Sequence, residues 1–572
     1  MTRKIDIEEM LRKASPATRR EFLRRAAVTG MSAPAALALL AGINPSGALA
    51  EGDDCPGNGA STDQFAAMPV KLQGEPKQGG TMVVMGHHEV ASLHPDDAGP
   101  SVHWVVVTQI HNALYEIDEN YQFNPVLAES YETSEDGITW TFKLREGVQF
   151  HDGEEFSSED VKYTYDWYLN PENAAINANE FASVASVEAP DEYTVVVTLK
   201  EPNPAFINKV AVQMIMPAHY HAEVGNDAYK AEPVGTGPFK LKEWRPAEST
   251  TLEAFDDHFR GRPHLDEFRE DIVPEASVRM IAMETGDADS AVWPLVTEDS
   301  LVLADNPDFT VFQTSGTAVN HFPLNNTAPQ LSDKRVRQAM LYAIDRQKVI
   351  DDIFQGAATI ATANLSPAFA DWYNPDVTLY PYDVEEAKAL LDEAGWTASG
   401  DEIREKDGET LSFTCTVITG DQARRPEAEV VQQYLRAVGI DMQIEEAPTA
   451  TILEQLREGN MQASLFNWTY GGDSADPDAL VTLKSDGANN FSHYSNPRVD
   501  ELLDQGLTEL DVEKRKAIYN EVQQIVADEV PFLYMMFWDI FTPFNGRIKG
   551  LPESAQTSDP IYAKAYQFWI EE

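Results

Sequence analysis

The sequence predicts an α/β protein with more than one domain, and three observations carry this prediction. The chain has 572 residues, which is more than one hydrophobic core usually holds. Between residues 80 and 200, short runs of β-branched and aromatic residues alternate with polar ones, as they do in strands. From about residue 331, helical patterns alternate with short strand-like runs, which indicates a partly parallel sheet.

The composition is that of a globular protein with a strongly acidic surface. Hydrophobic residues make up 43% of the chain and aromatic residues 10%, which argues against general disorder. The 94 Asp and Glu residues outnumber the 43 Lys and Arg residues, and the formal net charge is -51. Such a surface repels phosphate backbones, so we expect no nucleic-acid partner. The two cysteines, Cys55 and Cys415, allow at most one disulfide, and two free thiols are the simpler interpretation.

Residues 1–50 have the pattern of an export signal. Arg19-Arg20-Glu21-Phe22-Leu23 resembles the twin-arginine export motif, and a moderately apolar stretch and Ala48-Leu49-Ala50, a small-x-small cleavage site, follow. The apolar stretch is interrupted by glycine and proline and is too short to span a membrane. Cys55 does not directly follow a small-residue box, so we expect a soluble periplasmic protein and not a lipoprotein. Residues 51–78, rich in Gly, Asp and Pro, are expected to form a flexible leader.

The first half of the mature chain is predicted to be rich in strands. Residues 80–85 form a β-rich run, and a helix is expected within 101–115, ending at Leu114-Tyr115. Ser157 is expected to cap a helix, with Asp160 at the capping-box position. Two strands with turn residues beside them flank this helix, at 139–144 and 195–199.

The second half is predicted to contain longer helices. One begins at Ser332 and runs to about Phe354, with Gly356 as its stop, and a second runs from Asp383 to Gly395. The last segment, 531–572, is aromatic and strand-like again, so it could return to the first half. The other predicted elements are helices at 426–438, 497–507 and 511–529 and strands at 411–418, 440–445 and 463–468.

Six motifs, in one order along the chain, resemble those of a known family. They are Ser92-Leu93-His94-Pro95, the run Leu127–Gly153, Val234–Phe239, Asp333–Asp345, Asp383–Gly395 and Asp473-Ser474-Ala475-Asp476-Pro477. Together they are similar to the extracellular solute-binding proteins of family 5, which are the dipeptide and oligopeptide receptors of ABC importers. The resemblance covers about residues 79–570.

This resemblance implies a two-lobed periplasmic binding protein fold, type II and cluster C like, with an inserted subdomain in lobe I. Lobe I would comprise residues 79–318 plus 536–572, with the insert at about 112–230, and lobe II would comprise residues 319–535. The family encloses a ligand between two lobes that close by a hinge motion. We therefore expect a monomer with two partners, a small ligand and an inner-membrane ABC permease.

The resemblance also implies a ligand anchor. Peptide binders of the family pair a carboxylate with the amino terminus of the peptide, and Asp473 stands at the matching position. Trp468, however, lies five residues before this aspartate, where we expect three in a dipeptide binder. The pattern from Tyr470 to Pro477 is closer to members that take saccharides or opines. A peptide or peptide-like solute is therefore the first prediction, and an oligosaccharide, glycoside or opine is the alternative.

Further candidate ligand contacts are Arg425, Tyr494, Trp104 and Trp293. Arg425 and its neighbour Arg424 lie just before a helix, where the resemblance places an arginine for a ligand carboxylate, although a solvated pair is the alternative. The three aromatic residues could line the ligand or pack in a core.

Other functions are disfavoured. Adjacent histidines such as His87 and His88 point to opposite faces of a strand, so we expect no metal site, and no cofactor. Gly235-Thr236-Gly237 is followed by proline and is no dinucleotide loop, and no nucleophile-elbow, zinc-protease or Walker motif occurs, so we expect no enzyme. A periplasmic chaperone-like scaffold is the alternative from another functional class.

Overall fold

The computed structural model describes residues 74–87, 92–97, 101–119, 121, 123–292, 297–398, 402–419, 421, 424–470, 476–477, 479–555 and 559–571. The chain divides into two compact units, residues 1–60 and 61–572, and every described residue belongs to the second. The predicted export signal, most of the predicted leader, Cys55, Asp473 and Trp293 lie outside the described residues.

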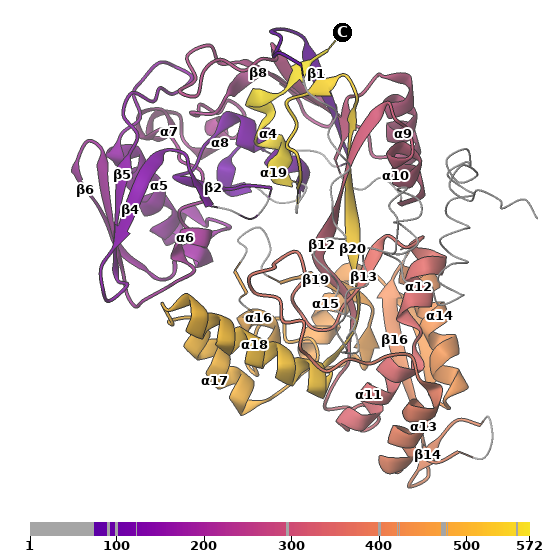
Figure 1. The fold of residues 1–572 in the computed structure, drawn as a ribbon. Helices are drawn as coiled ribbons and strands as arrows, with labels where there is room; N and C mark the ends of the chain where they lie inside the picture. Colours follow the sequence, from indigo (N-terminus) through magenta and orange to yellow (C-terminus); the bar gives the residue numbers. More distant parts are fainter. Residues whose placement is uncertain are drawn as a thin grey trace, which may run out of the picture. The chain divides into compact units, whose positions relative to one another are not determined.

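The largest sheet in the described part of the chain has nine strands and mixes both strand directions (Figure 1). Its order is β19-β12-β20-β11-β1-β10-β9-β8, and β13 pairs with β20 beside this path. Strand β1, Thr81–Gly86, confirms the predicted strand at 80–85 and runs parallel to β10 and β11. The other bounds are β8 Phe239–Arg245, β9 Ser249–Ala254, β10 Glu267–Ile272, β11 Ser290–Ala291, β12 Phe309–Pro323, β13 Ala358–Ile360, β19 Phe466–Thr469 and β20 Phe532–Asn545.

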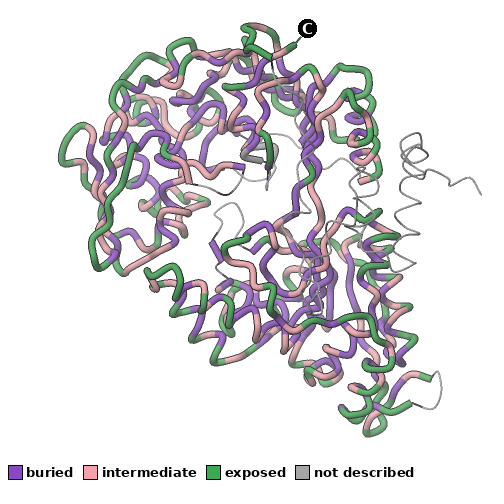
Figure 2. The backbone as a smooth tube through the Cα atoms, viewed as in Figure 1, coloured by how far each residue is buried: buried purple, intermediate pink, exposed green. Residues whose placement is uncertain are grey.

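Strands β12 and β20 form the longest antiparallel pair of this sheet. Their register runs from Phe309 opposite Asn545 to Pro323 opposite Phe532, with two irregularities near its middle. Most of their residues are buried (Figure 2). The predicted return of the C-terminal segment is confirmed, because Phe544 packs in one core cluster with Met82 and the other early residues. The predicted lobe boundaries fall inside these two strands, and the residues at which the lobes divide stay a prediction.

A second, four-stranded antiparallel sheet, here called the insert sheet, has the order β4-β5-β7-β6. Strands β5, Thr139–Leu144, and β7, Thr194–Leu199, confirm the two strands predicted there. Helix α5, Ser158–Leu169, packs on this sheet and begins as expected, since the Asp160 carboxylate accepts the Ser157 backbone N–H at 2.9 Å. The remaining strands are β4 Ala128–Thr133 and β6 Val184–Asp191.

The first predicted helix ends earlier than expected. Helix α4, Ser101–Ile110, stops before Leu114 and Tyr115, and Tyr115 begins strand β2 instead. The Tyr115 backbone N–H donates to the Ala211 carbonyl at 3.0 Å, and Ala113 forms an isolated bridge with Met214. Pairing with a distant segment therefore overrides the local helical pattern.

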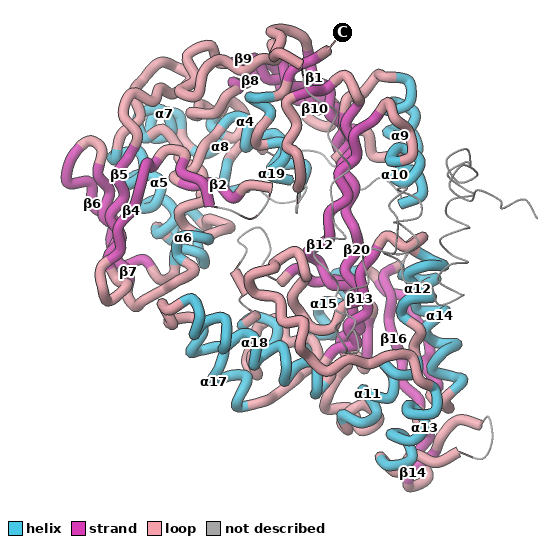
Figure 3. The backbone as a smooth tube through the Cα atoms, in the orientation of Figure 1, coloured by secondary structure: helices cyan, strands magenta, loops and turns pink. Residues whose placement is uncertain are grey.

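The C-terminal α/β region contains a three-stranded parallel sheet, β17-β16-β18, as the alternating pattern predicts (Figure 3). Helix α14, Arg424–Ala437, packs against it, and helix α13, Val384–Glu393, begins at Asp383, whose carboxylate accepts two backbone N–H groups. The predicted helices at 497–507 and 511–529 are α17, Pro497–Gly506, and α18, Val512–Glu529. The strands are β16 Ser412–Ile418, β17 Asp441–Ala447 and β18 Ala463–Ser464.

Two predictions in this region are wrong. The helix predicted from Ser332 to Phe354 is two helices, α11, Lys334–Ala343, and α12, Arg346–Ile353. Ile344 is extended between them, because the Asp345 carboxylate accepts the Lys348 backbone N–H at 3.0 Å and starts a new helix. The strand predicted at 463–468 is also two strands, since β18 joins the parallel sheet and β19 pairs with β12 in the large sheet.

The remaining elements are short. They are β2 Tyr115–Ile117, β3 Phe123–Pro125, α6 Phe206–Lys209, α7 Ala218–Val224, α8 Asn226–Tyr229, α9 Ala276–Thr285, α10 Thr297–Ala304, β14 Glu405–Lys406, β15 Glu409–Thr410, α15 Thr449–Glu458, α16 Leu480–Leu483, β21 Ile548–Lys549, α19 Asp559–Tyr562, β22 Trp569–Ile570 and the 3-10 turns η3 Pro95–Asp97, η4 Pro171–Asn173, η5 Ala178–Phe181 and η7 Ala565–Gln567. None of the helices in the described ranges is both long enough and apolar enough to cross a bilayer. Cys415 is a buried free thiol, and burial raises its pKa.

Candidate functional site

Asp476, in the Asp-Pro motif identified in the sequence, forms a buried ion pair. Arg515, on α18, donates to both carboxylate oxygens of Asp476 at 2.8 and 3.1 Å, and the two side chains are 5% and 1% exposed. The Arg515 guanidinium also donates to the Gly506 carbonyl at 2.8 Å. This pair fixes the chain three residues after Asp473, which itself lies outside the described residues.

The two aromatic residues predicted near this loop lie on or beside β19. Trp468 is half-buried, pairs with Val319 in the register of β12, and contacts Phe491 with ring centroids 6.0 Å apart. Tyr470 is fully buried, and desolvation raises its pKa to about 12. Trp468 therefore has surface left for a ligand, whereas the Tyr470 ring belongs to the core.

The structure separates the neighbouring arginines 424 and 425. Arg425, the predicted ligand contact, is 41% exposed and pairs with Glu429 at 2.7 Å and with Glu446. Arg424 is 12% exposed, pairs with Asp421, donates to Asn467 beside Trp468, and lies over the Trp538 ring at 5.5 Å. Of the two, Arg424 lies beside the strand that carries Trp468, whereas Arg425 has the solvated arrangement given as its alternative.

The remaining predicted residues do not gather at one place. Tyr494 is buried in the core around α17 and α18, and its hydroxyl donates to Glu529 at 2.5 Å. Trp104 is half-buried on α4, where its carbonyl accepts the Thr108 hydroxyl at 2.7 Å. Trp293 lies outside the described residues. The structure tests none of these ligand roles, and they stay predictions.

A buried carboxyl group lies next to the strand that carries Trp468. Glu427, on α14, is fully buried and accepts the Asn320 side-chain N–H at 2.6 Å. Burial raises the pKa of Glu427 to about 8, although the hydrogen bond from Asn320 and the charge of Arg424 oppose that shift. Asn320 lies on β12 opposite Asn467, so this group connects α14 with the large sheet.

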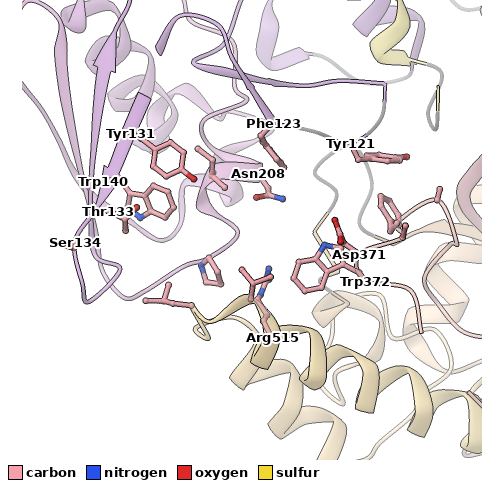
Figure 4. A pocket seen from close by; sticks show the side chains of 17 residues that line it. Tyr121, Phe123, Tyr131, Thr133, Ser134, Trp140, Asn208, Asp371, Trp372 and Arg515 are labelled. Carbon is pink, nitrogen blue, oxygen red and sulfur yellow. The ribbon is translucent and has the colours of Figure 1, made fainter. Parts of the chain in front are cut away.

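Sequence reasoning missed a cavity of the described residues. It has a volume of about 680 Å³ and lies between the insert sheet, the loop 368–372 and the start of helix α18 (Figure 4). None of the five predicted residues that the structure describes lines it. It is here called the aromatic cavity. Its lining comprises Tyr121, Phe123, Tyr131, Thr133, Ser134, Trp140, Pro204, Ile207, Asn208, Ala368, Phe369, Ala370, Asp371, Trp372, Leu510, Val512 and Arg515.

The two charged side chains in the wall of the aromatic cavity each pair with a residue of opposite charge. Arg515 lies in its wall but is bound to Asp476, and Asp371 lies 3.5 Å from the Lys516 ammonium. The Arg515 guanidinium also stacks over the Trp372 ring at 5.3 Å. One signal in the sequence could have pointed here, because the strand pair β4 and β5 carries large aromatic residues, Tyr131 and Trp140, in its alternating pattern.

These features suit reversible binding of a solute. The described residues contain no cluster of three or more His, Cys, Asp or Glu side chains placed to hold a metal ion. They do offer fixed polar groups beside the Asp-Pro motif and a cavity with six aromatic side chains in its wall that shares Arg515 with it, which are the components of a ligand site.

Comparison with known proteins agrees with this geometry. Oligopeptide-binding protein AppA of Bacillus subtilis (strain 168) is 28% identical over 488 residues, which cover 82% of this chain and 88% of AppA. Glutathione-binding protein GsiB of Escherichia coli (strain K12) is 29% identical over 487 residues, covering 82% of this chain and 91% of GsiB.

Solved structures have the same fold. The structure of B. subtilis AppA in complex with a nonapeptide superposes with a TM-score of 0.70 and 25% identity, covering 87% of this chain and all of AppA (100%). AgaA from A. tumefaciens R10 in complex with agropinic acid superposes with a TM-score of 0.69 and 25% identity, covering 86% of this chain and 99% of AgaA. The predicted two-lobed periplasmic binding protein fold is thereby confirmed.

The sequence pattern of the bacterial extracellular solute-binding proteins, family 5 (middle region), matches residues 122–492. Members of this family are substrate-binding transport proteins and not enzymes. The chain therefore belongs to the bacterial extracellular solute-binding proteins of family 5.

Proposed function

We propose that this protein is the receptor of an ABC importer and captures a peptide or peptide-like solute. The observation that carries this proposal is the similarity over more than four fifths of the chain to AppA and GsiB, whose names give them peptide ligands, oligopeptide and glutathione. The ligand would lie against Trp468 and Asp473, where the Asp476–Arg515 pair anchors the end of the loop. Asp473 would pair with the ligand ammonium, and an inner-membrane permease would be the partner.

Binding would proceed by population shift. A ligand that contacts both lobes only when they are close together stabilises the closed state. The ligand is bound and released without any chemical change. The mature receptor would act as a periplasmic monomer after export by the twin-arginine route, as the segment Arg19-Arg20-Glu21-Phe22-Leu23 indicates. Replacing Arg19 and Arg20 by lysine should abolish export, which cell fractionation measures. Normal periplasmic levels of the variant would contradict the export route.

An opine or a saccharide is the second candidate ligand. The two additional residues between Trp468 and Asp473 favour it, and so does the likeness to AgaA, which was solved with agropinic acid. A third possibility, a chaperone-like scaffold, requires no saturable small ligand.

A thermal-shift screen tests the proposal. Tetrapeptides, agropinic acid and cellotetraose are compared, since a ligand at 100 times its Kd adds about 2.7 kcal/mol to the free energy of unfolding. We expect a peptide to raise the melting temperature and Asp473→Ala to weaken its binding by about tenfold or more. Asp352→Ala is the matched control, at an exposed carboxylate on α12 that belongs to neither the proposed anchor nor the aromatic cavity. A rise with agropinic acid or cellotetraose alone would contradict the peptide assignment, and no saturable ligand would favour the scaffold.

A further inference from the structure

We propose that the aromatic cavity is a subsite for an aromatic side chain of the captured solute. The inference rests on the proposed function and deepens it, because it names the class of peptide. None of the five predicted residues that the structure describes lines this cavity, so the subsite adds residues that the sequence did not predict.

The first argument is the chemistry of the walls. On one wall, Tyr131 and Trp140 lie with ring centroids 5.3 Å apart and an interplanar angle of 33°. Trp372 lies on the other side of the cavity (Figure 4), and Phe369 also belongs to the lining. An aromatic ring packed against either wall would bury apolar surface and gain the offset or edge contacts that aromatic pairs prefer.

The second argument is that three polar side chains of the walls, Ser134, Arg515 and Asp371, already have partners. The Ser134 hydroxyl donates to Asp136 at 2.6 Å and accepts the Thr139 backbone N–H at 2.9 Å. Arg515 and Asp371 are bound to Asp476 and Lys516, as described above. A saccharide needs many free donors and acceptors, so this lining favours an apolar ring over a polyhydroxyl ligand.

One polar group remains available. The indole N–H of Trp140 is buried and has no hydrogen-bond partner among the residues that the structure describes, and Trp140 is 5% exposed. A buried donor without an acceptor costs free energy. A single acceptor on the ligand, such as a peptide carbonyl, would satisfy it.

The third argument is that two parts of the chain, far apart in sequence, approach each other at this cavity. Tyr121 contacts Phe369 with ring centroids 4.9 Å apart. A Cβ atom added to Gly137, in the β4–β5 turn, would lie 2.5 Å from a methyl group of Leu510, which shows how closely the turn and the loop before α18 pack. An occupant of the cavity would therefore contact both parts and would stabilise their approach.

The experiment uses a matched set of peptides. Binding of tetra-alanine is compared with that of the four tetrapeptides that carry one phenylalanine in place of an alanine, by isothermal titration of the mature protein. We expect at least one phenylalanine peptide to bind about tenfold more tightly than tetra-alanine. Trp372→Leu should remove this preference, so that the phenylalanine peptide binds no more tightly than tetra-alanine, whereas Trp244→Leu, a half-buried tryptophan on β8, should retain it.

A second measurement locates the ring independently of affinity. In protein labelled with 5-fluorotryptophan, the ¹⁹F resonances of Trp140 and Trp372, assigned by Trp→Phe variants, should shift with the preferred phenylalanine peptide and stay in place with tetra-alanine. Equal binding of all five peptides, or a preference without these shifts, overturns the subsite alone. If none of the five peptides binds, the peptide assignment in the proposed function fails, and the subsite fails with it.

Discussion

Arg515 connects the Asp-Pro motif with the aromatic cavity through one side chain. Its guanidinium holds Asp476 with two hydrogen bonds and lies over the rings of Trp372 and Tyr519, each at 5.3 Å. Burying two charges is costly, and only good geometry offsets that cost. The pair meets this condition because a planar guanidinium matches a carboxylate.

Arg515→Met should lower the free energy of unfolding by about 3–5 kcal/mol, because it leaves the Asp476 carboxylate buried without its guanidinium. The double variant Asp476→Leu with Arg515→Met should recover part of this loss, since it removes both charges. Arg498→Met is the control, because its ion pairs with Glu501 and Glu521 are exposed and should contribute little to stability. Urea unfolding measures all three, and equal losses for the two arginines would contradict the prediction.

At the scale of elements, side-chain capping decided boundaries that periodicity did not. Asp383 and Ser157 begin helices where the sequence predicts them, and in both cases a carboxylate accepts backbone N–H groups. Asp345 does the same inside a continuous apolar pattern and divides one predicted helix into two. The contact of α14 with β12 depends on a titratable group, Glu427.

Stability should depend on pH through Glu427. Its pKa is about 8 in the folded state against an ordinary value of 4.5, so between these values the folded protein binds more protons than the unfolded chain. The stabilisation from this group is therefore complete below pH about 4.5 and is lost as the pH rises through 8. Glu427→Gln stays neutral, so its melting temperature relative to wild type should rise between pH 5 and pH 9, by about 1–3 °C.

Scanning calorimetry at pH 5, 7 and 9 measures this difference. Glu429→Gln is the control, because Glu429 is exposed and paired with Arg425 on the same helix. A constant difference between Glu427→Gln and wild type across this range would show that Glu427 does not titrate there.

At the scale of the whole described molecule, β12 and β20 unite the large sheet. Strand β12 pairs with β20 along its length and with β19, which carries Trp468, while β20 also pairs with β11 and β13. Gly316 lies on β12 where it faces β20, and a Cβ atom at this position would approach the Trp538 carbonyl oxygen to 2.1 Å. The close approach of β12 and β20 therefore depends on the absence of a side chain at this position.

Gly316→Ala should separate the two strands locally, because a backbone carbonyl cannot move aside as a flexible side chain can. We expect a loss of about 1–3 kcal/mol in the free energy of unfolding and faster hydrogen exchange in β12 and β20. Thr317→Ala, at the next residue, should have a smaller effect on both. Unchanged exchange in Gly316→Ala would contradict this role of the glycine.

The sequence predicted more of the fold than of the site. Strands with alternating patterns, such as 139–144, and helices with a cap and a glycine stop, such as 383–395, form as expected because local signals determine them. Tyr115 and the divided strand at 463–468 differ because distant partners provide their hydrogen bonds. Of the neighbouring arginines 424 and 425, the sequence could not distinguish the exposed one from the buried one, since that depends on how α14 meets β12.

The sequence by itself determined the family and the order of the elements, because six motifs and the turn and cap residues act locally and need no partner. Only the tertiary structure decided that Arg515 holds Asp476 and that Tyr131, Trp140 and Trp372 line one cavity. Asp476 and Arg515 are 39 positions apart and Trp372 lies far along the chain from Tyr131 and Trp140, and no local pattern specifies which distant segment a side chain will meet. Their chemistry appears only when packing brings the segments together.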